Sequence, residues 1–239
     1  MDEKNNQNKT ICLVSGLINL EKYENHNRKL NFDFYRDRGQ EFIDLEIPKI
    51  IFMENENISK FTLNKFTSII PFEKNELFLH EYLDKCLSGE LIIPPTDNIL
   101  KDTALFHFIQ LQKTEWVSRA IDSKLVNCDI YCWMDFGISK IFTSKETFIQ
   151  LVNNIPKSTK ICSNKITIPG CWNPGFNYII PNPELVMWFF CGGFWCGDVC
   201  TIKKFNELCK NEIIKIIEKE KKIVYEVNLW YYVCKNNSY

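Results

Sequence analysis

Asp135 follows a run of five apolar residues, Ile130 to Met134, and Gly137 comes two positions after it. An acid that ends a strand buried on both faces lies at the carboxyl edge of its sheet, where open α/β folds bind ligands. Such a carboxylate can hydrogen-bond a ribose hydroxyl or hold a divalent cation that carries a diphosphate. Gly137 lets a ligand approach the backbone closely. The alternative is that Asp135 caps the following turn, a role that aspartate fills well.

A second candidate is the segment CGGFWCGD, residues 191 to 198. Its glycines, Gly192 and Gly193, let the backbone approach a sugar or a phosphate. The ring of Trp195 could stack on a sugar, and the carboxylate of Asp198 could bind its hydroxyls. The alternative is a bulge or bend between packed elements, with Trp195 in the core.

Three further polar residues stand where chemistry would need them. Glu226 and Asn228 interrupt the apolar stretch IVYEVNLWYYV, and a buried glutamate needs a partner or a function. If Glu226 faces a crevice, it could act as a general base or as a carboxylate nucleophile. It could instead begin a helix, or pair with a lysine of the preceding helix. Lys113 could offset the charge of a diphosphate leaving group, or it could be a solvated surface lysine.

The elements that must position these residues alternate in type. We expect strands at 10–17, 47–57, 65–72, 130–135, 160–170 and 176–181, and a buried strand that breaks into a glycine loop within 185–198. Helices are expected at about 32–44, 102–121, 147–155, 201–222 and 223–235, with Asp102 as the N-cap of the second and a capping box from Thr143 to Glu146 before the third. Alternating strands and helices predict an α/β fold with a mostly parallel sheet flanked by helices.

Composition sets the broad class. The chain has 239 residues, 45% of them hydrophobic, which suits a single domain over residues 1–239 with a flexible tail at 1–9. A net charge of −1 gives no field that would select nucleic acid or an anionic membrane. The most apolar run, LVMWFFCGGFW, is too short to span a bilayer. Eleven cysteines without zinc-type spacing, and a polar start without a signal sequence, favour reduced thiols and a cytoplasmic location.

The order of these features resembles the HtrL/YibB-like family, which looks like a branch of the A-type (GT-A) glycosyltransferases. The resemblance rests on TICLVSGL, IPKIIFMEN, a helix that carries Lys113 ahead of WMDFGI, the loop GGFWCG, a long amphipathic helix and EVNLW. It covers the chain roughly from Thr10 to Val233, and WMDFGI and GGFWCG are its most specific parts.

The resemblance implies a single GT-A-like (Rossmann-like) domain that binds a nucleotide-sugar donor, with a UDP-sugar as the first candidate. Asp135 matches the first acid of the D-x-D motif in that family, and Gly137 replaces the second. Asp135 would therefore be a ligand of Mn²⁺ or Mg²⁺, and phosphate and water would supply most other ligands. We expect weak, nucleotide-dependent binding of the ion.

The resemblance also assigns the remaining positions. The base would lie beside Val14, Ser15 and Gly16, with Lys113 near the phosphates. Gly192, Gly193, Trp195 and Asn228 would contact the acceptor side of the substrates. Glu226, beside the anomeric carbon, and Asp198, on the acceptor side, would be catalytic. The implied partners are the donor and a hydroxyl of a glycan or protein acceptor, and the oligomeric state stays open.

Two other function classes fit the same residues. Loss of the second acid of the motif is compatible with a non-catalytic module that binds a nucleotide or a carbohydrate. The many aromatic side chains are compatible with a structural protein that uses them at a partner interface.

Overall fold

The computed structural model describes residues 9–24, 31–96, 98, 101–158, 161, 164–171 and 185–236. At its centre lies a five-stranded sheet in the order β3-β2-β1-β4-β5. Its strands are β1 (Ile11–Leu17), β2 (Lys49–Met53), β3 (Thr67–Pro71), β4 (Ile130–Met134) and β5 (Phe194–Asp198). The first four strands are parallel, and β5 is antiparallel to β4. The predicted α/β fold with a mostly parallel sheet is confirmed.

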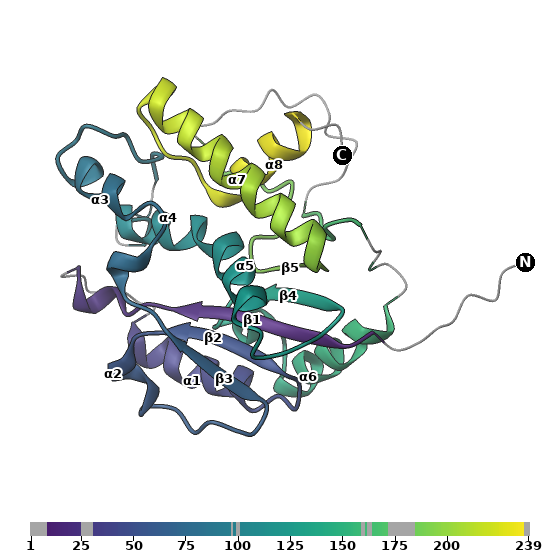
Figure 1. The fold of residues 1–239 in the computed structure, drawn as a ribbon. Helices are drawn as coiled ribbons and strands as arrows, with labels where there is room; N and C mark the ends of the chain where they lie inside the picture. The colour runs from purple at the N-terminus through teal and green to yellow at the C-terminus, as the bar shows by residue number, and fades with distance from the viewer. Residues whose placement is uncertain are drawn as a thin grey trace, which may run out of the picture.

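Helices cover both faces of this sheet (Figure 1). They are α1 (Phe32–Ile43), α2 (Asn55–Ile58), α3 (His80–Leu87), α4 (Ala104–Leu111), α5 (Lys113–Ser123), α6 (Lys145–Asn154), α7 (Val199–Glu220) and α8 (Glu226–Asn236). Short 3-10 turns are η1 (Leu20–Lys22), η2 (Lys74–Glu76), η3 (Ile138–Ile141) and η4 (Ile155–Lys157). In Figure 1, α3, α4, α5, α7 and α8 lie on one side of the sheet, and α1, α2 and α6 lie on the other. Within the described ranges, every helix is too short or too polar to cross a membrane.

Each strand contributes to two separate cores because successive side chains of a strand point to opposite faces. From β1, Cys12 and Val14 pack with residues of α5, α7 and α8. Leu13 and Leu17 of the same strand pack with residues of α1 and α6. Burial on both faces explains why β1, β2 and β4 read as continuous apolar runs in the sequence.

Two helix starts differ from the prediction. The expected helix at 102–121 is divided into α4 and α5, and its N-cap is Thr103, whose hydroxyl accepts a hydrogen bond from Phe106 N. The carboxylate of Asp102 cannot cap because it accepts from Thr96 Oγ1 instead, at 2.6 Å. At α6 the cap is Ser144, one residue after the expected position.

The region around the glycine loop also differs. The expected strand within 185–198 is confined to β5, after the glycines, and Leu185 and Trp188 are 59% and 44% exposed. In the expected strand at 160–170, the described residues form only isolated bridges, such as Thr167 with Cys196. The expected strand at 176–181 lies outside the described residues.

Candidate functional site

A cleft of about 380 Å³ opens at the carboxyl ends of β1 and β4. These strands are neighbours in the sheet, but the chain continues from β1 to β2 on the other side. This reversal of strand order leaves a crevice between the loops that follow the two strands, and open α/β sheets bind ligands there. The loop after β1, the turn after β4, the glycine loop and the start of α8 all line the cleft.

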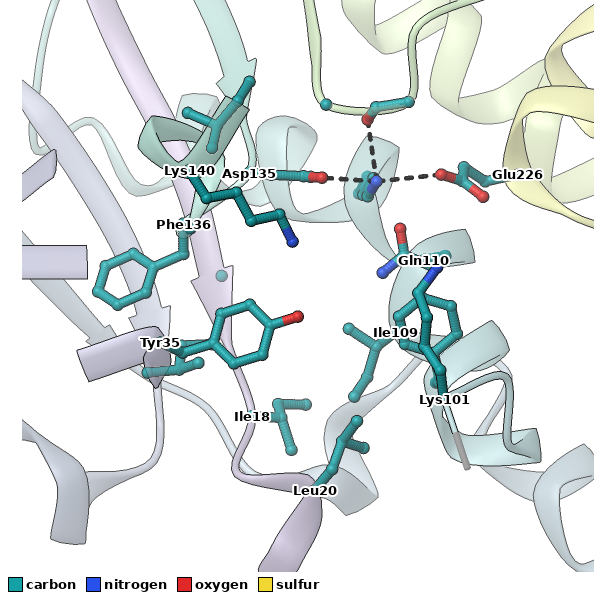
Figure 2. A pocket seen from close by; sticks show the side chains of 18 of the residues that line it. Ile18, Leu20, Tyr35, Lys101, Ile109, Gln110, Asp135, Phe136, Lys140 and Glu226 are labelled. Carbon is teal, nitrogen blue, oxygen red and sulfur yellow. Dashed lines mark hydrogen bonds and ion pairs between the residues drawn. The ribbon is translucent and has the colours of Figure 1, made fainter. Parts of the chain in front are cut away.

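The ammonium of Lys113 lies at the inner wall of this cleft and joins three segments of the chain. Its Nζ is 3.1 Å from Asp135 Oδ1, 3.1 Å from Glu226 Oε1 and 2.9 Å from the carbonyl oxygen of Gly192. Dashed lines in Figure 2 mark these contacts. Lys113 is the first residue of α5, and only 2% of its side chain is exposed. The structure therefore brings together Lys113, Asp135, Gly192 and Glu226, four residues that the sequence analysis assigned to one site.

The charge of Lys113 is maintained by its two carboxylate partners. Burial alone would lower the pKa of this ammonium, but Asp135 and Glu226 outweigh that effect, so the pKa is raised. An ammonium has three N–H donors, and three acceptors surround this one. Lys113 thus holds the site together and has no donor left for a phosphate. A direct hydrogen bond from Lys113 to a diphosphate does not match this geometry.

The glycine loop fits closely around the two acids. A Cβ on Gly192 would lie 2.5 Å from Glu226 Oε1, so the loop can approach the glutamate only without a side chain at this position. The carbonyl oxygen of Gly193 accepts a hydrogen bond from Asp135 N at 3.0 Å, and a Cβ there would lie 3.5 Å from Asp135 Oδ2. Both glycines line the cleft, as the sequence predicted.

Asp135 is the more accessible of the two acids. Its side chain is 39% exposed, whereas that of Glu226 is 9% exposed. Trp133 Nε1 donates to Asp135 Oδ1 at 2.8 Å, which fixes the carboxylate together with Lys113. The following turn, η3, has no side-chain cap. Asp135 Oδ2 is therefore the carboxylate oxygen that a ligand in the cleft would meet first.

The loop after β1 is held by a buried carboxylate, Glu54. Its side chain is fully buried and accepts hydrogen bonds from Asn19 N at 2.8 Å and from Tyr23 Oη at 2.7 Å. Glu21 extends the same framework, since its carboxylate accepts from Phe32 N at the start of α1. Rigid support of this kind presets the shape of the cleft wall.

The outer wall of the cleft contains side chains that the sequence did not single out (Figure 2). Lys140, in the turn after β4, directs its ammonium into the cleft, and the hydroxyl of Tyr35 points the same way. Gln110 lies opposite them, on α4. For Lys140, the sequence offered one signal of a place in the cleft, its position five residues after Asp135. For Tyr35 and Gln110 it offered none, because their placement depends on the packing of α1 and α4.

Apolar side chains form the floor between these polar groups. They are Ile18, Leu20 and Phe32 with Ile109. A cleft with an apolar floor and a few convergent polar groups is typical of small-molecule sites.

Two predicted catalytic or acceptor residues lie elsewhere. Asp198 pairs with Ile130 at the amino end of β4, so it is at the opposite edge of the sheet from Asp135. Its Oδ1 accepts from Thr201 N and Thr201 Oγ1, which makes Asp198 the N-cap of α7. Trp195 is fully buried and packs against Trp230 in the core, as the alternative for this segment predicted. The prediction failed for Asp198 because a β5 antiparallel to β4 carries it away from the cleft.

Three more predicted residues support the cleft without lining it. Asn228 is buried, accepts from Met187 N at 2.7 Å and donates to the carbonyl oxygen of Leu185, so it fixes the segment before the glycine loop. Val14 and Ser15 are fully buried in β1, and Ser15 Oγ donates to the carbonyl oxygen of Met134.

Two predicted glycines do lie at the cleft. Gly16 lines it, and a Cβ there would lie 2.5 Å from the ring of Trp116. Gly137 lines it beside Tyr35.

A divalent cation held by several protein ligands does not fit the donor set around Asp135. Oδ1 of this residue already faces an ammonium and an indole N–H, and the second acid of the motif is Gly137. The ammonium of Lys113 lies between Asp135 and Glu226, where a cation bridging the two acids would have to be. Across the described ranges, no three histidine, cysteine or acidic side chains are grouped to hold a metal ion.

Comparison with models of known protein families and with curated proteins gives no match for this chain.

Proposed function

We propose that this protein is a glycosyltransferase that moves a sugar from a nucleotide-sugar donor, with a UDP-sugar as the first candidate, to a hydroxyl of a glycan or protein acceptor. One observation carries the proposal. Two acids from distant parts of the chain, Asp135 and Glu226, converge on one buried cation inside a cleft at the switch point of the sheet. The order of motifs that resembles GT-A glycosyltransferases supports the same assignment.

The cleft offers a distinct surface to each part of such a donor. The apolar floor suits a nucleobase, with Tyr35 able to stack or to donate a hydrogen bond. Asp135 Oδ2 can accept a hydrogen bond from a ribose hydroxyl, because it lies at the carboxyl end of a strand beside the switch point, where open α/β sheets bind ligands. The sugar would then lie toward the glycine loop and Glu226.

Glu226 is suited to the reacting end of the donor. Sugar transfer passes through an oxocarbenium-like state, and a carboxylate fixed nearby stabilises the developing positive charge. Lys113 bonds only Oε1 of Glu226, at 3.1 Å. No second hydrogen bond or ion pair to this carboxylate is found among the described residues, so Oε2 is available to the reaction. The acceptor would enter past the exposed apolar side chains that line the cleft, Trp188 and Ile141.

The decisive experiment measures release of UDP from a panel of UDP-sugars without acceptor, with the Glu226→Gln variant as the matched control. The proposal expects slow hydrolysis by the wild type and at least a 100-fold loss in the variant, roughly the scale of one lost electrostatic contact. Thermal stabilisation by UDP without any turnover would instead favour a non-catalytic nucleotide-binding module. If no nucleotide sugar stabilises the protein and none is turned over, the result would favour a structural interaction protein.

A further inference from the structure

The position where GT-A enzymes carry a second metal-binding acid is closed in this protein by an aromatic ring. Gly137 occupies it, and a Cβ on Gly137 would lie 3.0 Å from Tyr35 Cδ1 and 3.1 Å from Tyr35 Cε1. A carboxylate there would require the ring to move. The site is thus built around the absence of a side chain at 137, and Tyr35 fills the space that a second acid would use.

A lysine ammonium lies over this ring. Lys140 Nζ lies 5.6 Å from the centroid of the Tyr35 ring and 5.9 Å from that of Phe34, within the range of cation–π attraction. Figure 2 shows the ammonium directed into the cleft, beside the Tyr35 hydroxyl and on the same side as Asp135. No hydrogen bond or ion pair joins it to any residue that the structure describes. Its N–H donors therefore face the cleft without a protein acceptor.

The surroundings of Lys140 favour an anion as the missing partner. Partial desolvation in the cleft and the charges of Lys101 and Lys113 lower the pKa of Lys140, whereas Asp135 raises it, and the residue as a whole is exposed. An anion at Lys140 would offset the repulsion from the other two lysines. Lys113 cannot take this role because its three donors are already bonded within the protein.

We infer that Lys140, held by Tyr35, supplies the positive charge that binds the diphosphate of the donor, in place of a divalent cation. This inference rests on the proposed function for the identity of the ligand, but its chemistry requires only a phosphate-bearing anion. A lysine ammonium binds phosphate oxygens as a point charge. The ammonium of Lys140 would offset the negative charge of the leaving diphosphate without a metal ion.

Calorimetric titration with UDP, inorganic pyrophosphate and uridine tests the inference, in buffers with excess EDTA and with Mn²⁺. The wild type is expected to bind UDP and pyrophosphate in EDTA with affinities within about threefold of those in Mn²⁺. Lys140→Met should weaken both at least about tenfold, the scale of one charge-assisted contact, and should leave uridine affinity unchanged. Lys140→Arg should retain most of the affinity.

Lys145→Met is the matched control, because Lys145 pairs with Asp44 at the surface of α6 and does not line the cleft. It should leave every affinity unchanged. Wild-type binding of UDP that vanishes in EDTA, or a Lys140→Met variant that binds like the wild type, would overturn the inference. Pyrophosphate binding through Lys140 without hydrolysis of any nucleotide sugar would uphold it while the proposed function fails. Turnover that depends on Mn²⁺ and is indifferent to Lys140 would do the reverse.

Discussion

Asp135 and Glu226 share a single counter-ion, with one oxygen of each carboxylate 3.1 Å from the Nζ atom of Lys113. Asp135 directly follows β4, and Glu226 begins α8. The two acids would repel each other without the cation between them, and the cation would be destabilised by burial without the acids. The three side chains therefore form one electrostatic unit, which links the sheet to the C-terminal helix.

Replacing Lys113 should destabilise the fold strongly. Lys113→Met leaves a nearly buried Glu226 without its counter-ion, which should cost about 3–5 kcal/mol of the free energy of unfolding. In the double variant Lys113→Met/Glu226→Gln, the unpaired charge is removed, so the total loss should be smaller than the sum of the single losses. Urea denaturation of the four proteins measures both quantities. Additive losses would show that the two groups are not coupled.

Glu226→Gln should separate catalysis from binding. The amide oxygen can still accept from Lys113, so the melting temperature should fall only modestly, and the affinity for UDP should stay within about threefold. Turnover of a UDP-sugar should fall by about 100-fold or more because the charge that faces the developing cation is lost. Both properties are measured on one preparation. A stable variant with wild-type turnover would remove Glu226 from the mechanism and leave it only its ion pair.

Asp135→Asn should lose nucleotide binding with little loss of stability. Asparagine keeps an oxygen that can accept from Trp133 Nε1, and the half-exposed position needs no charge to be solvated. The loss of the charged acceptor for a ribose hydroxyl should lower UDP affinity by about tenfold or more. Calorimetry and thermal melting test the two statements. Unfolding of the variant, together with no nucleotide binding by the wild type, would leave Asp135 only a structural role in its contacts with Lys113 and Trp133.

The two glycines of the loop should differ in sensitivity. Gly192→Ala places a Cβ 2.5 Å from Glu226 Oε1, so the glutamate must leave its position beside Lys113. We expect turnover to fall by at least about tenfold in this variant, since small displacements of a catalytic group are costly. Gly193→Ala is the control, because the nearest atom to its Cβ is the flexible end of Ile138 at 3.2 Å. Equal losses in the two variants would contradict a specific effect on Glu226.

The stability of the fold should depend on pH through Lys49, which is remote from the cleft. Burial lowers the pKa of this lysine to about 8, although its Nζ donates to the carbonyl oxygens of Ile43 and Leu45. Between pH 8 and the ordinary lysine value of 10.5, the unfolded chain keeps a proton that the folded protein has released. Stability should therefore rise with pH across this window, by about 3 kcal/mol at most.

The matched variant for this prediction is Lys49→Met, which removes the titrating group from the same buried position. The difference in unfolding free energy between wild type and variant should be flat below about pH 7 and should rise in favour of the wild type from pH 8 to 10.5. A difference that does not change with pH would show that the pKa of Lys49 is not lowered.

The sequence by itself determined the buried central strands β1, β2 and β4 and the edge of the sheet at which the cleft lies. Continuous apolar runs indicate strands buried on both faces, as found for β1, β2 and β4, and a parallel sheet exposes the carboxyl end of each such strand in a crevice. Asp135 could be placed in the cleft for this reason. Glu226 could be identified as a buried acid from the local sequence alone, because its neighbours on both sides are apolar.

The tertiary structure alone decided which side chains share a space. β5 runs antiparallel to β4, so Asp198 lies beside the amino end of β4, away from the cleft. The residue types of the segment 191–198 had suited a sugar site. Lys113 was expected near the phosphates of a donor. Because α5 packs against the sheet, its ammonium is instead buried between Asp135 and Glu226. Lys140 lines the cleft together with Tyr35 of α1, whose ring its ammonium contacts. Local periodicity encodes burial, but strand direction and helix packing are set by contacts between residues far apart in the chain, which no local pattern records.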